Sequence, residues 1–544
     1  MSMDRLGRSW AVTENVSMNI TADYVIVGSG SAGAVLAARL SENPAVTVVL
    51  LEAGKDRTKE LFVRMPAGSF AMMQRERYDW SYQTEPDPTI GNRTLNWSGG
   101  KMLGGSSSIN GMVYVRGNRQ DYDRWEADGA IGWGWNAMLP YFLRSEQFTG
   151  PNSQWHGSHG PMKVGPANAR HPICDAVIGA FEACGVPRLS EYCAGEQFGV
   201  YDIYTTAPGG TRRSTAEAFL SEARHRQNLT IVTDAMADKV IIKDGCAVGV
   251  RALVGGEARD FMAGEVIVSA GTLQSPGVLM RSGIGPSAHL QELGIPVVAD
   301  LPVGRNLHDH NGVSTSRFID MPTYNSPFGP WTIAKNLARW MIKKDGPMAS
   351  AAVHVMAGVK SHLASDEADV SISMLALAID ISSGAPRMSN RPGITIGGSN
   401  MRPRSRGELR LRSTDPRDKP VIDHRLLSDE SDLERLVFFL KFVDQVWSSQ
   451  PLSNHVTGMN SPERPLVTDD ERRDWIRSMV GIGYHPVGTC RMGGVGSVCD
   501  PELRVRGVSG LRVCDASVMP QVVSGNTNAA TIALAERAAD LIRG

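Results

Sequence analysis

The 544-residue sequence lacks an excess of charge, paired cysteines and a long apolar run. Its formal net charge is −1, so it has no basic field that would attract nucleic acid or a lipid surface. Its cysteines form no C-x-x-C pair and are odd in number, at positions 174, 184, 193, 246, 490, 499 and 514. We expect them to be reduced thiols without a disulfide framework.

No apolar stretch approaches the roughly 20 residues that a membrane-spanning helix needs. The first twenty residues, MSMDRLGRSWAVTENVSMNI, also lack the continuous apolar run of a secretory signal. We therefore expect a cytoplasmic protein without stable membrane insertion, present as a monomer or a small homo-oligomer.

The composition is that of a large globular protein, with 42% hydrophobic and 21% charged residues. A chain of this length exceeds one ordinary core, so two domains or an interleaved pair are expected. The 57 glycines favour a fold with many tight turns and close approaches between backbone and ligand.

Residues 23–54, DYVIVGSGSAGAVLAARLSENPAVTVVLLEAG, have the pattern of a strand, a helix and a second strand. The β-branched run 24–27 predicts a buried strand, and an apolar helix is predicted over 34–40. A second buried strand is predicted over 46–51. The turn between the first strand and the helix reads G-x-G-x-x-G, so the segment carries a dinucleotide-binding fingerprint in its required context.

Each residue of this fingerprint has a physical role. Gly28 permits the tight turn, Gly30 lets the backbone approach a pyrophosphate, and Gly33 lets the helix pack against the strand. The helix N-terminus offers free N–H groups to the phosphates. Glu52, after the second strand, can accept hydrogen bonds from ribose hydroxyls. The fingerprint alone does not separate NAD from FAD, although its position early in a long chain favours FAD.

A second glycine cluster lies in GGKMLGGSSSINGMVYVRGNRQDYDRW, residues 99–125. Small residues at this density let a loop press against a flat ring system with its N–H groups directed at the ring. Apolar residues are interleaved with the glycines and serines, and a solvated linker would not carry them.

Four segments resemble the motifs of the glucose–methanol–choline oxidoreductases, a family of flavoproteins. GKMLGGSSSIN and GTLQSPGVLMRSGIG (271–285) resemble its two signatures, whereas HPVGTCRMGG and DASVMPQVVSGNTNAATIALAERAADLI resemble its C-terminal blocks. The resemblance runs from about residue 23 to 542, with no recognisable motif between about 315 and 400. It implies an α/β fold with a Rossmann-type FAD-binding domain and an interleaved α+β substrate domain built on an antiparallel sheet.

The resemblance also implies a catalytic pair. In the family, a histidine in H-P-x-G-T and a later asparagine or histidine face the reactive edge of the flavin, and the matching residues are His485 and Asn526. A neutral imidazole with a pKa near neutrality suits a general base, and an amide can hydrogen-bond the developing alkoxide. The flavin accepts the hydride at N5.

The implied reaction is the FAD-dependent oxidation of an alcohol to the aldehyde, by an alcohol oxidase or dehydrogenase. A primary alcohol fits best, because its carbinol is the least crowded beside N5. Oxygen, a quinone or another electron acceptor would reoxidise the flavin, and composition favours none of them. The alternative is a flavin-containing enzyme of the hydroxynitrile lyase type, which turns over without net redox change.

The resemblance implies a wider set of cofactor contacts. Some family members attach FAD through a histidine of the glycine–serine loop, and because Ile109 stands at that position we expect non-covalent FAD. The segment NLHDH, 306–310, resembles a structural turn of the family, and we expect no metal site there. The residues expected around FAD are Gly28, Gly30, Ser31, Ala32, Gly33, Glu52, Ala53, Trp80, Met102, Leu103, Gly105, Ser106, Asn110, Gly111, Met112, Val113, Val240, Ala270, Gly271, Tyr484, Asp515, Ala516, Asn526, Thr527 and Asn528.

The order of the motifs predicts a discontinuous organisation. The FAD-binding domain is expected to comprise residues 1–165, 225–315 and 475–544, and the substrate-binding domain residues 166–224 and 316–474. In the first, LTIVTDAMADKVII and GEVIVSAGTLQS are predicted as later strands. In the second, DVSISMLALAI and GELRLRS alternate as strands, and 429–447 has the pattern of an amphipathic helix with an acidic start.

Overall fold

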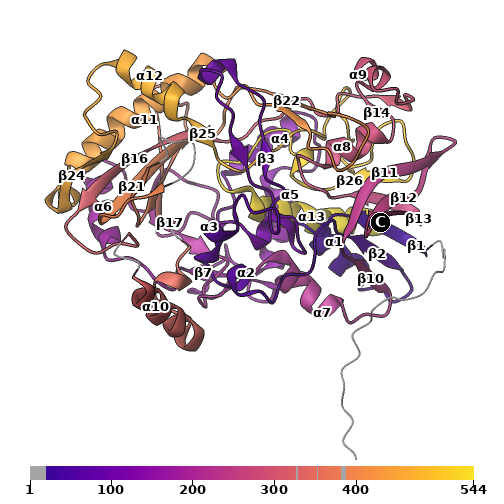
Figure 1. The fold of residues 1–544 in the computed structure, drawn as a ribbon, viewed down its shortest axis with the longest axis horizontal. Helices are drawn as coiled ribbons and strands as arrows, with labels where there is room; N and C mark the ends of the chain where they lie inside the picture. Colours follow the sequence, from indigo (N-terminus) through magenta and orange to yellow (C-terminus); the bar gives the residue numbers. More distant parts are fainter. Residues whose placement is uncertain (1–19, 326–328, 352, 381–386) are drawn as a thin grey trace, which may run out of the picture.

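Two large β-sheets organise the chain (Figure 1), and the computed structural model describes residues 20–325, 329–351, 353–380 and 387–544. The first sheet has seven strands in the order β10-β2-β1-β13-β12-β11, with β26 added beside β13. In Figure 1 it lies at the right. Its strands are β1 (Ile20–Val27), β2 (Val48–Leu51), β10 (Leu229–Val232), β11 (Ala235–Lys243), β12 (Cys246–Val254), β13 (Glu257–Val268) and β26 (Leu511–Val513).

The predicted fingerprint forms the centre of this sheet. β1 pairs in parallel with β2 and with β13, and the helix α1 (Gly33–Leu40) follows the glycine-rich turn. Val25, Ile26 and Leu50 are fully buried, as their β-branched and aliphatic side chains favour. At Gly33 an added Cβ would lie 1.8 Å from the carbonyl oxygen of Gly28, so only glycine fits where the helix packs on the turn. The predicted strand, helix and strand are confirmed.

Helix α13 (Thr527–Arg543) packs against α1 and α5 (Trp135–Ser145) beside the first sheet. Its many alanines allow close approach between the helices. Its one fully buried acid, Glu536, is bonded by two arginines, with Arg39 Nη2 at 2.8 Å and Arg144 Nε at 2.8 Å. Because a buried carboxylate is stable only when paired, this cluster fixes α13 against α1.

The second sheet lies at the left in Figure 1 and is antiparallel throughout, in the order β17-β18-β21-β16-β24 with β25 beside β16. Two helices, α6 (Ile173–Ala183) and α11 (Glu430–Ser448), share its hydrophobic core. Its strands are β16 (Asn311–Ile319), β17 (Val353–Val359), β18 (Val370–Leu375), β21 (Gly393–Asn400), β24 (Val456–Ser461) and β25 (Gly481–Ile482).

The predicted fold class, a Rossmann-type α/β sheet with a second antiparallel sheet, is therefore confirmed. Helix α11 begins after Asp429, whose carboxylate accepts a hydrogen bond from the Ser431 amide. One predicted strand differs in its partner: β22 (Glu408–Arg410) forms a two-stranded sheet with β23 (Val421–Asp423), and its Leu409 belongs to the core of the first sheet.

The two sheets are joined through the start of β16. The expected domain boundary after residue 315 falls within this strand, and β25, from the segment expected in the FAD-binding domain, pairs with its first residues. Residues 306–319 thus connect the two sheets, which the expected boundary assigns to different domains.

A buried ion-pair network lies beside the small sheet of β5 (Val113–Tyr114), β9 (Tyr204–Thr205), β7 (Met162–Pro166) and β6 (Glu146–Phe148). Arg116 Nη2 lies 2.6 Å from Glu146 Oε2, and both side chains are fully buried.

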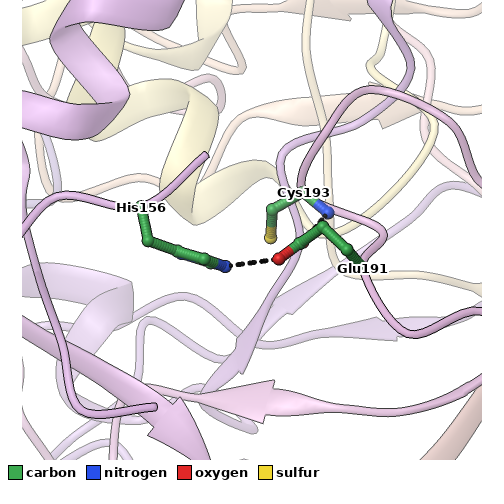
Figure 2. A group of neighbouring side chains, drawn as sticks. All are labelled: His156, Glu191 and Cys193. Carbon is green, nitrogen blue, oxygen red and sulfur yellow. Dashed lines mark hydrogen bonds and ion pairs between the residues drawn. The ribbon is translucent and has the colours of Figure 1, made fainter. Parts of the chain in front are cut away.

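His156 bridges two carboxylates of this network. Its Nδ1 lies 2.9 Å from Glu146 Oε1, and its Nε2 lies 2.9 Å from Glu191 Oε2, the contact that Figure 2 shows. Burial opposes the charged form of His156, but the two hydrogen bonds outweigh it and raise its pKa. Figure 2 shows the Cys193 thiol beside His156 and Glu191. Burial raises the pKa of that thiol. Like the other six cysteines, Cys193 is free of disulfides.

Candidate active site

One cavity of about 490 Å³ extends from the glycine-rich turn after β1 to the loop that carries His485. This volume lies within the range typical of small-molecule sites. The residues expected from sequence that line it are Gly28, Gly30, Ser31, Ala32, Glu52, Ala53, Trp80, Gly105, Ser106, Asn110, Gly111, Met112, Val113, Ala270, Gly271, Tyr484, His485, Asp515, Ala516, Asn526, Thr527 and Asn528.

Four expected residues lie outside this lining. Gly33 packs beneath the turn, and Met102 and Leu103 are buried in hydrophobic clusters. The Val240 N–H donates at 2.8 Å to Oγ of Ser282, the residue that follows helix α8 (Ser275–Arg281). The residues of β11 that reach the cavity are instead its first three, 235–237.

The end of the cavity at the fingerprint is shaped for close approach by a ligand. A Cβ added at Gly30 would meet no atom within 4 Å, so the backbone there is open to the cavity. Glu52 Oε2 accepts hydrogen bonds from the Ser29 amide at 3.0 Å and hydroxyl at 2.6 Å, and its Oε1 accepts one from the Gly54 amide at 2.8 Å. Ser31 Oγ donates to Asn528 Oδ1 at 2.7 Å, which ties the start of α13 to the turn.

The loop that presents His485 is held in a conformation rare for non-glycine residues. Tyr484 has φ 63°, in the left-handed region, which persists only where the surroundings enforce it. Asp309 Oδ1 accepts the His485 N–H at 2.9 Å, and Thr272 Oγ1 donates to the Pro486 carbonyl at 2.7 Å. Two distant segments therefore fix the loop on both sides of the histidine.

His485 stands between Asn526 and His310. Its Nε2 lies 2.8 Å from Asn526 Nδ2, and its Nδ1 lies 3.0 Å from His310 Nδ1. Asn526 is the N-cap of α13, and His310 directly precedes β16. The structure thus brings together the two residues expected as a catalytic pair and adds a second histidine from the segment that joins the sheets.

Burial shifts the pKa values of His485, His310 and Asp309. Burial, and next the proximity of His310, lower the pKa of His485 to about 3, and burial lowers the pKa of His310 to about 4. The near-neutral pKa expected for His485 from the sequence is therefore wrong. Burial also raises the pKa of Asp309 to about 8, although the hydrogen bonds that Asp309 accepts from backbone N–H groups lower this pKa. Both histidines are neutral at neutral pH.

The interpretation of NLHDH as a structural turn is incomplete. His308 has that role, since its Nε2 accepts the Val522 N–H at 3.0 Å and its backbone pairs with Val487. His310, two residues later, contacts the expected base directly. The spacing of the two histidines gave no signal for this difference, because residues two apart in an extended segment point to the same side.

Sequence reasoning also did not identify the wall of the cavity that comes from the second sheet and from the helix α3 (Gly68–Met72). These residues share no motif, and their position at the cavity depends on tertiary packing. They include Ser69, Phe70, Met73, Ser350, Ala351, Val353 and Leu375.

Comparison with protein families gives two matches along the chain. The GMC oxidoreductase N-terminal family model matches residues 22–312, and the C-terminal one matches residues 403–535. The chain belongs to the GMC oxidoreductase family. GMC membership makes it an FAD-dependent oxidoreductase that acts on CH–OH donors, as expected.

Among GMC relatives, an oxygen-dependent choline dehydrogenase of Brucella suis biovar 1 (strain 1330) is 38% identical over 529 residues, which cover 96% of each chain. The corresponding enzyme of Sinorhizobium medicae (strain WSM419) is 38% identical over 531 residues, again with 96% of each chain covered.

Solved GMC structures share the whole fold. Pyridoxine 4-oxidase from Mesorbium loti has a TM-score of 0.87 at 30% identity, with 95% of this chain and 98% of that chain covered. A formate oxidase variant of Aspergillus oryzae RIB40 has a TM-score of 0.89 at 26% identity, with 96% and 98% covered. Within the described ranges, no helix has both the length and the apolar character to cross a membrane.

Proposed function

We propose that this GMC oxidoreductase oxidises a neutral primary alcohol to the aldehyde, with His485 as general base and Asn526 as a donor to the developing alkoxide. The observation that carries the proposal is the single cavity that joins the dinucleotide fingerprint to the His485–Asn526 pair. FAD bound along the fingerprint supplies the hydride acceptor at its N5 atom.

The hydrogen-bond partners support Nε2 of His485 as the nitrogen that accepts the proton. His310 Nε2 lies 3.0 Å from the Val523 carbonyl and 3.1 Å from the Met401 carbonyl, and carbonyls only accept, so this nitrogen carries hydrogen. Since His310 is neutral, its Nδ1 has a lone pair and accepts from His485 Nδ1. His485 Nε2 is then unprotonated, which agrees with its contact to the Asn526 amide donor.

An alcohol hydroxyl beside this nitrogen can lose its proton to Nε2 as the hydride leaves carbon. The Asn526 amide, 2.8 Å from the same nitrogen, can turn its donor to the substrate oxygen and stabilise the charge that develops there. His310 touches no substrate in this scheme and is a positioning residue, because it holds the tautomer that leaves Nε2 free.

The cavity lining supports a substrate without a cationic group. Among the lining residues that the structure describes, only Glu52 and Asp515 are acidic and none is a lysine or arginine. Glu52 bonds the Ser29 and Gly54 amides, and Asp515 Oδ2 accepts from the Gly271 amide at 2.9 Å and the Ser275 hydroxyl at 2.5 Å. A quaternary ammonium beside neutral His485 would be desolvated without an opposing charge. We therefore favour neutral alcohols over choline, the substrate in the names of the relatives.

The test is anaerobic mixing of the oxidised holoenzyme with benzyl alcohol, 1-hexanol and choline, followed by the flavin absorbance. We expect bleaching by the neutral alcohols and little by choline. Reduction by choline alone would contradict the neutral substrate, whereas cleavage of a cyanohydrin with the flavin still oxidised would establish the lyase alternative. Oxygen uptake during turnover tests oxygen as the electron acceptor, which the names of the oxygen-dependent relatives support.

A further inference from the structure

Helix α10 (Pro330–Lys343) exposes large apolar side chains that its own packing does not use. Trp331 is 88% exposed, Ile342 81% and Met341 58%. The opposite side of the helix holds it to the protein: Trp340 is buried with Met65 and Ala349, and its Nε1 donates to the Gly210 carbonyl at 2.6 Å. In Figure 1 the helix projects from the lower left of the molecule.

The exposed side of α10 has an ordered arrangement. Positions 331, 334, 338, 341 and 342 follow helical spacing and carry Trp, Ala, Ala, Met and Ile, so they form one apolar stripe. Lys335, Arg339 and Lys343 recur every four residues and border the stripe on one side. Residues 330–344 contain no acid. Within the part of the chain that the structure describes, Arg339 is the only cation of this segment with an ion-pair partner, Asp345 at 2.6 Å.

We propose that α10 lies flat on the surface of an anionic phospholipid bilayer, with Trp331, Met341 and Ile342 among the lipid headgroups and upper acyl chains. An apolar stripe bordered by lysines is the pattern of helices that bind in the plane of the membrane interface. Tryptophan favours this interface, and lysine side chains can extend to the lipid phosphates while their methylene stems stay buried.

The net charge of −1 gave no sign of attraction to lipid. It is a sum over the whole chain, so it hides the local excess of lysine and arginine on α10. A second copy of the protein is a weaker match for the stripe, because a symmetric contact would bring the same cationic border to the interface from both sides. A bilayer with anionic headgroups offers both the apolar and the negative surface at once.

Bilayer contact would bring the cavity close to the membrane. Ser350 and Ala351, a few residues after α10, line the cavity, and so does Pro66, next to the Met65 that packs on Trp340. Apolar alcohols concentrate in bilayers, so a membrane-bound enzyme would meet them at raised local concentration. This consequence rests on the proposed function, whereas the binding itself does not.

The experiment is flotation of the intact holoenzyme with vesicles of phosphatidylcholine alone or with 30% phosphatidylglycerol. We expect flotation with the anionic vesicles, weakened by salt. The double variant Trp331→Ser/Ile342→Ser should bind at least tenfold more weakly, from the two lost apolar side chains. Lys335→Gln and Lys343→Gln should each weaken binding about fivefold. Ile131→Ser, at a 66% exposed isoleucine of another surface, is the matched control and should bind as the wild type does.

Flavin content and melting temperature confirm that each variant is folded. Absence of flotation with anionic vesicles overturns the proposal, as does equal flotation of the Trp331→Ser/Ile342→Ser variant. Light scattering tests whether a second copy of the protein covers α10 instead. A dimeric wild type, a monomeric Trp331→Ser/Ile342→Ser variant and no vesicle binding would together assign this face to a second copy. Because flotation needs no substrate, its result is independent of the proposed reaction.

Discussion

Replacement of His310 tests whether the tautomer of His485 is held by its neighbour. His310→Leu removes the acceptor 3.0 Å from His485 Nδ1 and leaves His485 and Asn526 in place. A neutral hydrogen bond of this kind contributes about 0.5–1.5 kcal/mol. Its loss lets the proton of His485 move to Nε2, so the fraction of enzyme with a free Nε2 should fall by roughly 2- to 12-fold. The rate constant for flavin reduction should fall by a similar factor.

His310→Asn is the matched variant, because the asparagine Oδ1 lies close to the position of the histidine Nδ1 and can accept the same proton. Stopped-flow reduction under anaerobic conditions should give nearly the wild-type rate for Asn and the loss for Leu. The rescue by asparagine is the second readout, because a merely structural loss of the His310 side chain would slow both variants. Wild-type reduction in a flavin-loaded His310→Leu protein, or an equal loss in the His310→Asn protein, would refute the tautomer argument.

Four further predictions concern the base, the cofactor and the buried ion pairs. His485→Ala should retain FAD but lose about 10²–10⁴-fold in flavin reduction, and the double variant with Asn526→Ala should lose less than the product of the single losses; near-wild-type reduction would exclude His485 as the base. Acid precipitation should release the flavin into the supernatant, because Ile109 offers no nucleophile, and yellow colour in the pellet would contradict this. Glu52→Ala should weaken FAD binding by about 1–3 kcal/mol, measured by fluorescence of released flavin, and unchanged affinity would count against a ribose contact. The raised pKa of His156 stabilises the fold at pH values below its unfolded pKa, so the melting temperature should fall as pH rises through its folded pKa; a His156→Gln protein with the same pH dependence would refute this role.

The sequence predicted the local units of the fold well. The fingerprint was readable because Gly28, Gly30 and Gly33 stand at fixed spacing between buried apolar runs. Pairing between distant segments was harder to predict. LTIVTDAMADKVII gives two strands at opposite ends of the sheet order, divided by a turn in which Asp234 has φ 54°. Likewise β22 has the alternation of a sheet strand, but its partner depends on tertiary packing and not on its own periodicity.

The candidate site was predictable to the extent that it is made of motifs. His485 and Asn526 come from short blocks that resemble family motifs, and the structure places His485 Nε2 2.8 Å from Asn526 Nδ2. His310 was not recognised because its contact with His485 depends on how β16 meets the first sheet. The pKa of His485 was misjudged for a similar reason, since burial is a property of the folded chain.

The order of the elements along the chain determines when the site can form during synthesis. β26 completes the first sheet beside β13, and Asn526 begins α13, yet both are translated after every strand of the second sheet. During synthesis the first domain therefore stays incomplete while the antiparallel sheet is translated. In that period β13 lacks its neighbour β26, and α1 lacks its contact with α13. Cofactor capture around a complete site is a late event, and a protein truncated before residue 511 would lack the strand, the helix and the amide that the site requires.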